Sequence, residues 1–259
     1  MQEVVHLERS RGAATITLDS QPNRNALSRR LRSELAAHLR SALADPAVRV
    51  VVLTHAGPAF SAGADLSEVR DGDAEAEARS VPLPELLAAL LDAPKPVVAR
   101  VAGPARAGGI GLIACCDVAI ASTTSNFALT EVRVGVVPVL ISVPLLPLLG
   151  RRAAQRLMLT GETFGAEQAV EVGLLTRAVP VADLDAEVDR AVTELCAGAP
   201  QAVAATKEVL AAATGRGEEL RRRLAAVNAV SQRHFASEEA AEGIAAFREK
   251  RAPRWVPER

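Results

Sequence analysis

The first half of the chain alternates short apolar runs with longer segments of helical periodicity. Residues 4–7 and 14–18 have the composition of strands, and residues 117–121 form a further short candidate. Residues 49–53 and 97–101 are runs rich in valine, as expected of strands that are largely buried on both faces. This alternation of strands and helices predicts an α/β fold.

Helical segments separate these runs. Ser28 can cap a helix that ends before Pro46, and its apolar stripe consists of Leu31, Leu35, Leu39 and Leu43. Residues 108–116 are expected to form a short buried helix that opens with glycines. The second half is mostly helical, with candidates at residues 150–159, 166–172, 184–196 and 200–213 and a last helix that begins near Ser237. We therefore expect a body over residues 1–199 and a helical region over residues 200–259.

Two stretches depart from the alternation. Residues 68–84 are acidic and poor in large apolar groups, which favours a mobile surface loop. Residues 134–150 carry no charge, but three prolines interrupt them, so a buried turn and helix is expected rather than a membrane span.

Composition excludes several classes of function. The 30 basic and 31 acidic residues nearly cancel, and aromatic residues are scarce, so neither a cationic surface nor a stacking platform for nucleic acid is expected. The three cysteines have no spacing that suggests disulfides or a zinc site. The first residues lack the apolar core of a signal peptide, and a cytoplasmic location is expected.

Residues 60–66, Phe-Ser-Ala-Gly-Ala-Asp-Leu, follow a buried candidate strand. Their small side chains would let a ligand approach the backbone closely, and Asp65 fits the start of a helix. Taken alone, the block is also compatible with a tight strand-to-helix turn.

Residues 107–111, Ala-Gly-Gly-Ile-Gly, open an apolar helix, where free N–H groups could stabilise an oxyanion. Gly109, Gly111 and Ala114 also match the dinucleotide-binding pattern G-x-G-x-x-A, with Glu131 about 20 residues further on. However, these glycines do not directly follow their strand, which ends at Val101, and Glu131 lies well past the end of the next candidate strand. Both observations disfavour a Rossmann fold.

Glu131 lies in a largely apolar stretch, residues 127–133. A carboxyl group in such surroundings can have a raised pKa, which suits proton transfer. An ion pair with Arg133 or an exposed turn is the alternative. The sequence contains neither a G-x-S-x-G nor an H-E-x-x-H motif.

Taken in order, these blocks resemble the enoyl-CoA hydratase/isomerase (crotonase) family over nearly the whole chain. Further matching segments are residues 23–28, 156–162, 173–175 and 246–251, together with Cys116-Asp117. The resemblance implies a spiral core of repeated ββα units and a C-terminal helical region that builds trimers, often hexamers.

The resemblance also implies a coenzyme A thioester substrate, and we expect no cofactor besides the coenzyme A of the substrate. From composition and sequence pattern, no metal and no nucleic-acid or membrane partner is expected. The thioester carbonyl would accept hydrogen bonds from the N–H groups of Ala64 and Gly108, and Glu131 would move the proton. Positions expected along the coenzyme A path are Ala62, Ala64, Asp65, Leu66, Ser67 and Gly108. Phe247 and Lys250 match a tail segment that can complete a neighbouring subunit's pocket.

One departure leaves the reaction open. Typical hydratases of the family carry two glutamates; Glu131 matches the second, whereas Gly111 stands at the position of the first. A hydratase is the favoured reading, a Δ3,Δ2-enoyl-CoA isomerase with the single Glu131 is the alternative, and another acyl-CoA reaction or a non-catalytic acyl-CoA-binding protein stays open. Glu68, Asp71 and Asp73 are candidates for a second proton donor.

Overall fold

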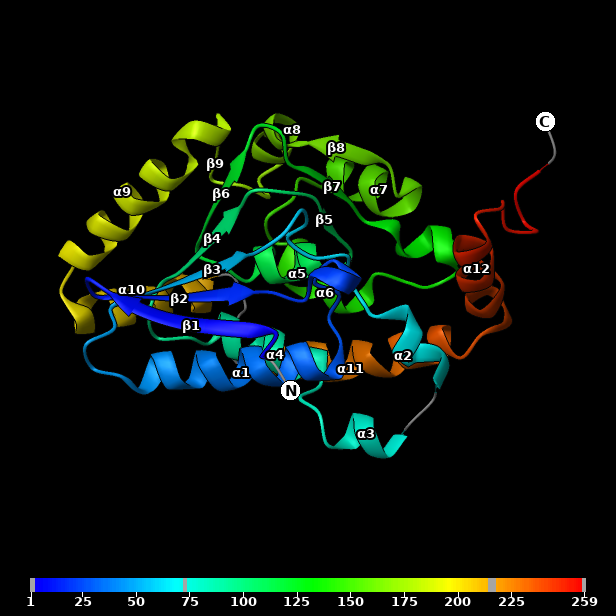
Figure 1. Cartoon of the computed structure of the whole chain (residues 1–259), viewed down its shortest axis with the longest axis horizontal. Helices are drawn as coiled ribbons and strands as arrows, with labels where there is room; N and C mark the ends of the chain where they lie inside the picture. Colours follow the sequence, from blue (N-terminus) through cyan, green and yellow to red (C-terminus); the bar gives the residue numbers. More distant parts are fainter. Residues whose placement is uncertain (1–2, 72–73, 214–217, 258–259) are drawn as a thin grey trace.

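A six-stranded sheet forms the centre of the molecule (Figure 1). The computed structural model describes residues 3–71, 74–213 and 218–257. The strands follow the order β1-β2-β3-β4-β6-β9, with β1 antiparallel to β2 and every later pair parallel. Their bounds are β1 Val5–Ser10, β2 Ala13–Leu18, β3 Val50–His55, β4 Val97–Val101, β6 Val118–Ser122 and β9 Arg177–Val179.

Both faces of the central strands β3 and β4 are covered, which explains why these two strands are rich in valine. Successive side chains of a strand point to opposite faces. In β3, Val51 and Leu53 join the cluster that includes the leucines of α1 (Arg29–Ala44), whereas Val50 and Val52 pack with residues of α9 (Leu184–Ala197). The first four residues of β3 are therefore apolar on both faces, and the polar residues Thr54 and His55 stand at its end.

A second, three-stranded sheet was not anticipated from the sequence. It consists of β5 (Ala105–Arg106), β7 (Asn126–Ala128) and β8 (Thr163–Gly165), in that order, with β5 parallel to β7 and β7 antiparallel to β8. Strands of two or three residues give too short a pattern to be recognised. This sheet places the segment before the glycines beside the segment before Glu131.

The predicted cap and stripe of α1 are confirmed. The Ser28 hydroxyl accepts a hydrogen bond from the Leu31 N–H at 3.3 Å, and Leu31, Leu35 and Leu39 are buried. The helix ends at Ala44, before Pro46. This helix and α4 (Leu83–Leu91) lie on the same side of the sheet.

The prediction of a loop over residues 68–84 is wrong. This region contains α2 (Leu66–Asp71) and α3 (Ala74–Ala78), and α4 begins at Leu83. The acidic residues that suggested an exposed loop bind arginines of α1 instead: Glu68 accepts a hydrogen bond from the Arg29 N–H at 2.8 Å, and Glu77 pairs with Arg32 at 2.6 Å. Charge alone therefore did not distinguish a solvated loop from short helices tied to a neighbour.

The rest of the chain is mainly helical. Its helices are η1 Gln21–Asn23, α5 Gly108–Ala114, η2 Thr130–Val134, α6 Val139–Leu145, α7 Arg151–Thr160, α8 Ala166–Glu171, η3 Val181–Asp183, α10 Pro200–Ala213, α11 Glu218–Phe235 and α12 Glu238–Glu249. The stretch from residue 134 to 150 forms the expected buried turn and helix. In the part of the chain that the structure describes, no helix is both long and apolar enough to cross a membrane.

The C-terminal helices pack on the same chain's core. α11 packs against α4 and α6, and α12 packs against η2, which carries Glu131. The contact with η2 is close: a side-chain carbon placed on Gly243 of α12 would lie 2.4 Å from the carbonyl carbon of Val134. The last helix begins near Ser237 as predicted, and the Ser237 hydroxyl caps it by accepting a hydrogen bond from the Ala240 N–H at 3.1 Å.

Candidate active site

Two backbone segments run side by side at the centre of the candidate site. The Phe60 N–H donates to the Pro104 carbonyl at 2.9 Å, and the Arg106 N–H donates to the Ser61 carbonyl at 2.9 Å. Ser61 and Ala105 form a parallel bridge. Because the two segments run in the same direction, Ala64 and Gly108 both lie just beyond the C-terminal end of the paired stretch.

Glycines let these segments meet. Gly63 has φ +87°, and a side-chain carbon placed there would lie 2.8 Å from Ala107 Cβ and 3.5 Å from the Gly108 nitrogen. A side-chain carbon on Gly108 would lie 2.8 Å from Leu27 Cδ1. A larger residue at Gly63 would push the two segments apart, and a larger residue at Gly108 would displace Leu27.

The N–H groups of Ala64 and Gly108 are available to a ligand. Gly108 is the first residue of α5, where N–H groups have no acceptor within the helix. Within the described residues, neither N–H donates a hydrogen bond to a protein acceptor, although the neighbouring Ala107 N–H donates to the Ala128 carbonyl at 3.1 Å. Two such donors could stabilise an oxyanion.

Ala107 has an unusual backbone conformation directly before Gly108. Its φ is +48° and its ψ is −118°, a region that glycine adopts far more readily than alanine. Strain of this kind is often found where a backbone group is aimed at a ligand. The conformation of Ala107 sets the direction from which α5 begins.

Glu131 is buried in η2, and its carboxyl group forms no ion pair within residues 3–71, 74–213 and 218–257. Its buried Oε2 atom has no hydrogen-bond partner in these residues either, and burial raises the pKa of the carboxyl group to about 7. Arg133, the alternative partner considered from the sequence, instead donates to the Thr160 carbonyl at 3.0 Å. A carboxyl group that titrates near neutral pH can both accept and donate a proton.

The small sheet connects Glu131 to the glycine segment. Arg106 pairs with Ala128 in the β5–β7 ladder, and the Ala107 N–H donates to the Ala128 carbonyl. Glu131 follows three residues after Ala128, in the turn that leaves β7. The glycines of α5 follow β5, a two-residue strand of the small sheet, and not β4 of the parallel sheet, which differs from the strand-to-helix turn of a dinucleotide-binding fold.

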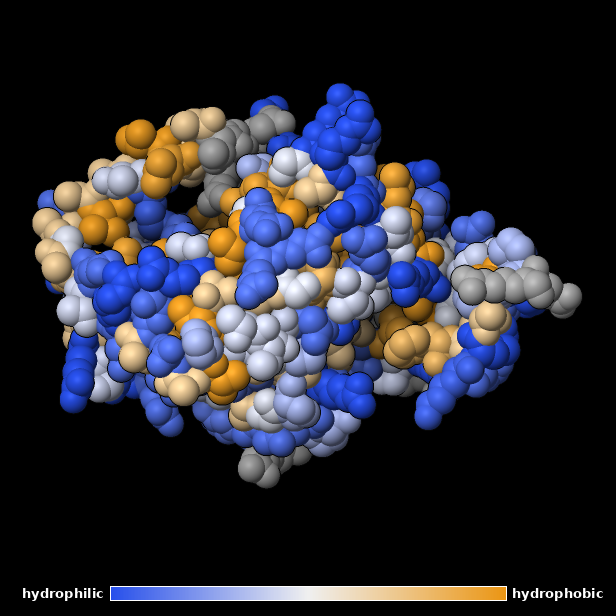
Figure 2. Space-filling view, turned by 90° about the horizontal axis from the view of Figure 1, so that it is seen from above, coloured by the Kyte–Doolittle hydropathy of each residue, from blue (hydrophilic) through white to orange (hydrophobic). Residues whose placement is uncertain are grey.

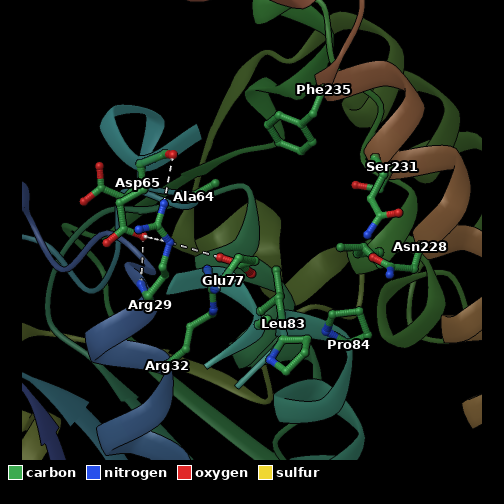
Figure 3. Close-up of a pocket in the computed structure, with 15 residues that line it drawn as sticks. Arg29, Arg32, Ala64, Asp65, Glu77, Leu83, Pro84, Asn228, Ser231 and Phe235 are labelled. Atoms are coloured by element: carbon green, nitrogen blue, oxygen red, sulfur yellow. Dashed lines mark hydrogen bonds and ion pairs between the residues drawn. The ribbon is translucent and has the colours of Figure 1, made fainter. Parts of the chain in front are cut away.

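A cavity of about 570 Å³ opens beside Ala64 (Figure 3). Figure 3 shows Asp65 and the arginines of α1 on one side, and Asn228, Ser231 and Phe235 of α11 on the other. Leu83, Pro84 and Leu140 add an apolar surface between the two sides. Leu83 also lies beside the glycine segment, since its Cδ2 would be 3.7 Å from a side-chain carbon on Gly108.

Of the other positions expected along the coenzyme A path, some line the cavity and others do not. Asp65 lines the cavity, begins α2 by accepting from the Ser67 N–H at 3.0 Å, and accepts from Asn23 at 3.0 Å. Although burial opposes ionisation, the hydrogen bonds from Ser67 and Asn23 hold the pKa of Asp65 below its usual range. Ala62 is exposed, and neither it, Leu66 nor Ser67 lines the cavity.

Phe247 and Lys250 are exposed near the end of α12 and do not line this cavity. Their neighbour Arg248 donates a hydrogen bond to the Leu66 carbonyl of the same chain. The expectation that Phe247 and Lys250 complete a neighbouring subunit's pocket stays a prediction.

Position 111 lies against α6. A side-chain carbon on Gly111 would lie 2.6 Å from Ile141 Cγ2 and 3.7 Å from Leu87 Cδ2.

Among the alternative proton donors, Glu68 lines the cavity but pairs with Arg29 at 3.8 Å. Asp71 is the last residue of α2, and Asp73 lies outside the described residues.

Sequence reasoning missed the contribution of α11 to the cavity, because Asn228, Ser231 and Gln232 belong to no recognisable motif. It also missed Asn23, whose amide holds Asp65. Over the described ranges, no group of His, Cys, Asp and Glu side chains is arranged to hold a metal ion.

The arrangement of the two sheets and the helices around them defines the class of fold to which this chain belongs. Residues 8–258 match the family model "Enoyl-CoA hydratase/isomerase", and the chain belongs to this crotonase family. The fold is the α/β crotonase fold, with two mixed sheets and C-terminal helices.

Three proteins illustrate the similarity. An enoyl-CoA hydratase structure from Mycobacterium avium is 45% identical, with a TM-score of 0.88 over 99% of this chain and 100% of that chain. A Thermus thermophilus protein named "Putative enoyl-CoA hydratase" is 40% identical over 93% of this chain and 96% of its own length. The Escherichia coli K12 carnitinyl-CoA dehydratase is 33% identical over 98% of this chain and 99% of its own length.

Proposed function

We propose that this protein is an enoyl-CoA hydratase that adds water across the double bond of a 2-trans-enoyl-CoA. The observation that carries the proposal is Glu131, a buried carboxyl group with an unpartnered oxygen and a pKa near 7. It lies on a segment that a hydrogen bond ties to the residue before Gly108. The hydratase names of relatives at 40% and 45% identity support the same reaction.

The N–H groups of Ala64 and Gly108 hold the thioester oxygen. Attack on carbon 3 of the enoyl chain moves an electron pair through carbon 2 onto this oxygen and produces an enolate. Donors that bind the enolate oxygen more strongly than the ground-state carbonyl lower the barrier, and one donor contributes about 3–4 kcal/mol. The close contact between Gly63 and Gly108 keeps the N–H groups of Ala64 and Gly108 at the same end of the paired segments.

Glu131 moves the proton in both steps. As a carboxylate it takes a proton from water while the water oxygen bonds to carbon 3. As a carboxylic acid it then returns the proton to carbon 2, and the enolate collapses to the saturated thioester. The sum of the two steps is addition of one water molecule, and Glu131 ends in its starting state.

A Δ3,Δ2-enoyl-CoA isomerase is the second candidate, and the contact between Gly111 and Ile141 favours it. The apolar Ile141 side chain lies where a second carboxylate would project. Without a second acid to hold water, Glu131 could instead take a proton from carbon 2 of a 3-enoyl-CoA and return it to carbon 4. A non-catalytic acyl-CoA-binding protein is the third alternative, because it requires no second acid at all.

One assay separates these functions. The protein is incubated with 2-trans-enoyl-CoA and with 3-enoyl-CoA, and products are identified by mass and chromatography. We expect a product heavier by one water from the 2-enoyl ester. If only the 3-enoyl ester reacts, and its product has the same mass as the substrate, the protein is an isomerase and not a hydratase. Binding of both esters without turnover would support the third alternative, a non-catalytic acyl-CoA-binding protein.

The substrate brings its own coenzyme A, and we propose no additional cofactor.

We also propose a trimer or a dimer of trimers. The exposed helix α10 supports this, because none of its residues is buried and Val209 is 68% exposed. Figure 2 shows hydrophobic surface toward the end of the molecule that carries α9 and α10.

A further inference from the structure

We propose that the acyl group runs from Ala64 past Asn228 into a groove between α4 and α11, and that Asn228 controls how long an acyl chain the site accepts. This inference rests on the proposed function because it takes the cavity beside Ala64 as the acyl site. It adds a substrate class, esters of long, mainly apolar acyl chains.

The groove continues the cavity. It measures about 520 Å³ and shares three lining residues with the cavity: Pro82, Pro84 and Asn228. An apolar cavity of about 150 Å³ holds a benzene ring, so the cavity beside Ala64 has room for a short acyl group together with part of the coenzyme A arm. The groove adds a further space of similar size for the distal part of a longer chain.

The walls of the groove suit a hydrocarbon chain. Leu224 and Ala225 of α11 face Ala88 and Ala89 of α4 across it. The acidic residues among its lining, Glu85 and Asp92, lie at the two ends of α4. Each methylene that leaves water for apolar surroundings tightens binding up to about fourfold.

Asn228 lies at the junction of the two spaces. Among the described residues of α11, it is the one that lines both. Its side chain is half-buried and has no hydrogen-bond partner in the described part of the protein, so no internal contact fixes the amide. Figure 3 shows Asn228 beside Pro84, on the opposite side of the cavity from Arg29 and Ala64. A larger side chain here would close the passage.

The test measures affinity, so that it does not depend on turnover. Dissociation constants are determined by calorimetry for butanoyl-CoA and dodecanoyl-CoA, which lack the reactive double bond, below the micelle concentration. The variants are Asn228→Phe at the junction and Ala225→Phe in the groove. Ala226→Phe is the matched control, because Ala226 is an exposed neighbour on α11 that lines neither space.

We expect the wild-type protein and Ala226→Phe to bind dodecanoyl-CoA at least tenfold more tightly than butanoyl-CoA. Asn228→Phe and Ala225→Phe should lose most of this gain. Ala225→Phe, which does not line the cavity beside Ala64, should bind butanoyl-CoA within about twofold of wild type. Equal affinities of the wild type for the two esters would overturn the inference, as would an undiminished gain in both groove variants. Loss of turnover with the affinity pattern intact would remove the proposed reaction but not the acyl path.

Discussion

The Ile141 side chain fills the space beside Gly111, where its Cγ2 would lie 2.6 Å from any side-chain carbon. Typical hydratases of the family carry a glutamate at this position. Restoring that residue in this chain therefore requires a change in α6 as well as in α5.

We expect Gly111→Glu alone to lower the free energy of unfolding by about 1–3 kcal/mol, because the new side chain overpacks against Ile141. Adding Ile141→Ala should recover part of this loss, since it removes the atom in contact. Urea unfolding of the two single variants and the double variant measures the coupling. Strictly additive losses would show that the two positions do not compete for the same space.

Ala107→Gly should leave stability unchanged or raise it by up to about 1 kcal/mol. Glycine removes the strain of a φ of +48°, and this offsets the greater freedom that glycine gives the unfolded chain. The matched control is Ala205→Gly in the exposed helix α10, which should cost about 1 kcal/mol. Thermal and urea unfolding compare them, and equal losses would contradict strain at Ala107.

Glu131→Gln should lower turnover about 10²–10⁴-fold, because the amide cannot take and return the proton. The affinity for an unreactive acyl-CoA should change little, since the thioester is held by backbone groups. Steady-state kinetics and calorimetry on the same preparation separate the two effects. Unchanged turnover would remove Glu131 from the reaction.

Glu131 should also make stability depend on pH. Its pKa is about 7 in the folded protein against an ordinary 4.5, so the folded state holds an extra proton between these values. Stability is therefore lost as pH rises from 4.5 through 7, by up to about 3 kcal/mol.

Urea unfolding at pH 5 and pH 8 tests this dependence. The difference between the two pH values should be smaller in Glu131→Gln than in the wild type. The same pH dependence in both proteins would mean that Glu131 is not desolvated in the folded state.

Gly243→Ala should destabilise the contact between α12 and η2, since the added methyl group would lie 2.4 Å from the Val134 carbonyl carbon. We expect a loss of about 1–3 kcal/mol and reduced turnover through displacement of η2. Gly150→Ala is the control, because nothing lies within 4 Å of a side-chain carbon there. Similar effects of the two substitutions would show that the packing of α12 is not responsible.

The sequence identified those parts of the fold and site that depend on local pattern. The valine runs, the leucine stripe of α1 and the glycines before α5 each leave a periodic or compositional signal. Glu131 was recognisable because it stands alone among apolar residues. Its burial in the structure agrees with the raised pKa expected from that pattern.

The remaining features depend on contacts between distant residues. The strand β5 has two residues, and its register appears only when it pairs with β7. The helices α2 and α3 looked like a loop because Arg29 and Arg32, their partners, lie about forty residues earlier in the chain. Likewise, no local pattern brings Asn228 of α11 opposite Ala64.

The packing of α12 against η2 within one chain has a consequence for assembly. Each polypeptide supplies the surroundings of Glu131 from its own α12, so association with other copies is not needed to keep this carboxyl group away from water. We expect the raised pKa of Glu131 to persist on dilution, even where oligomers separate.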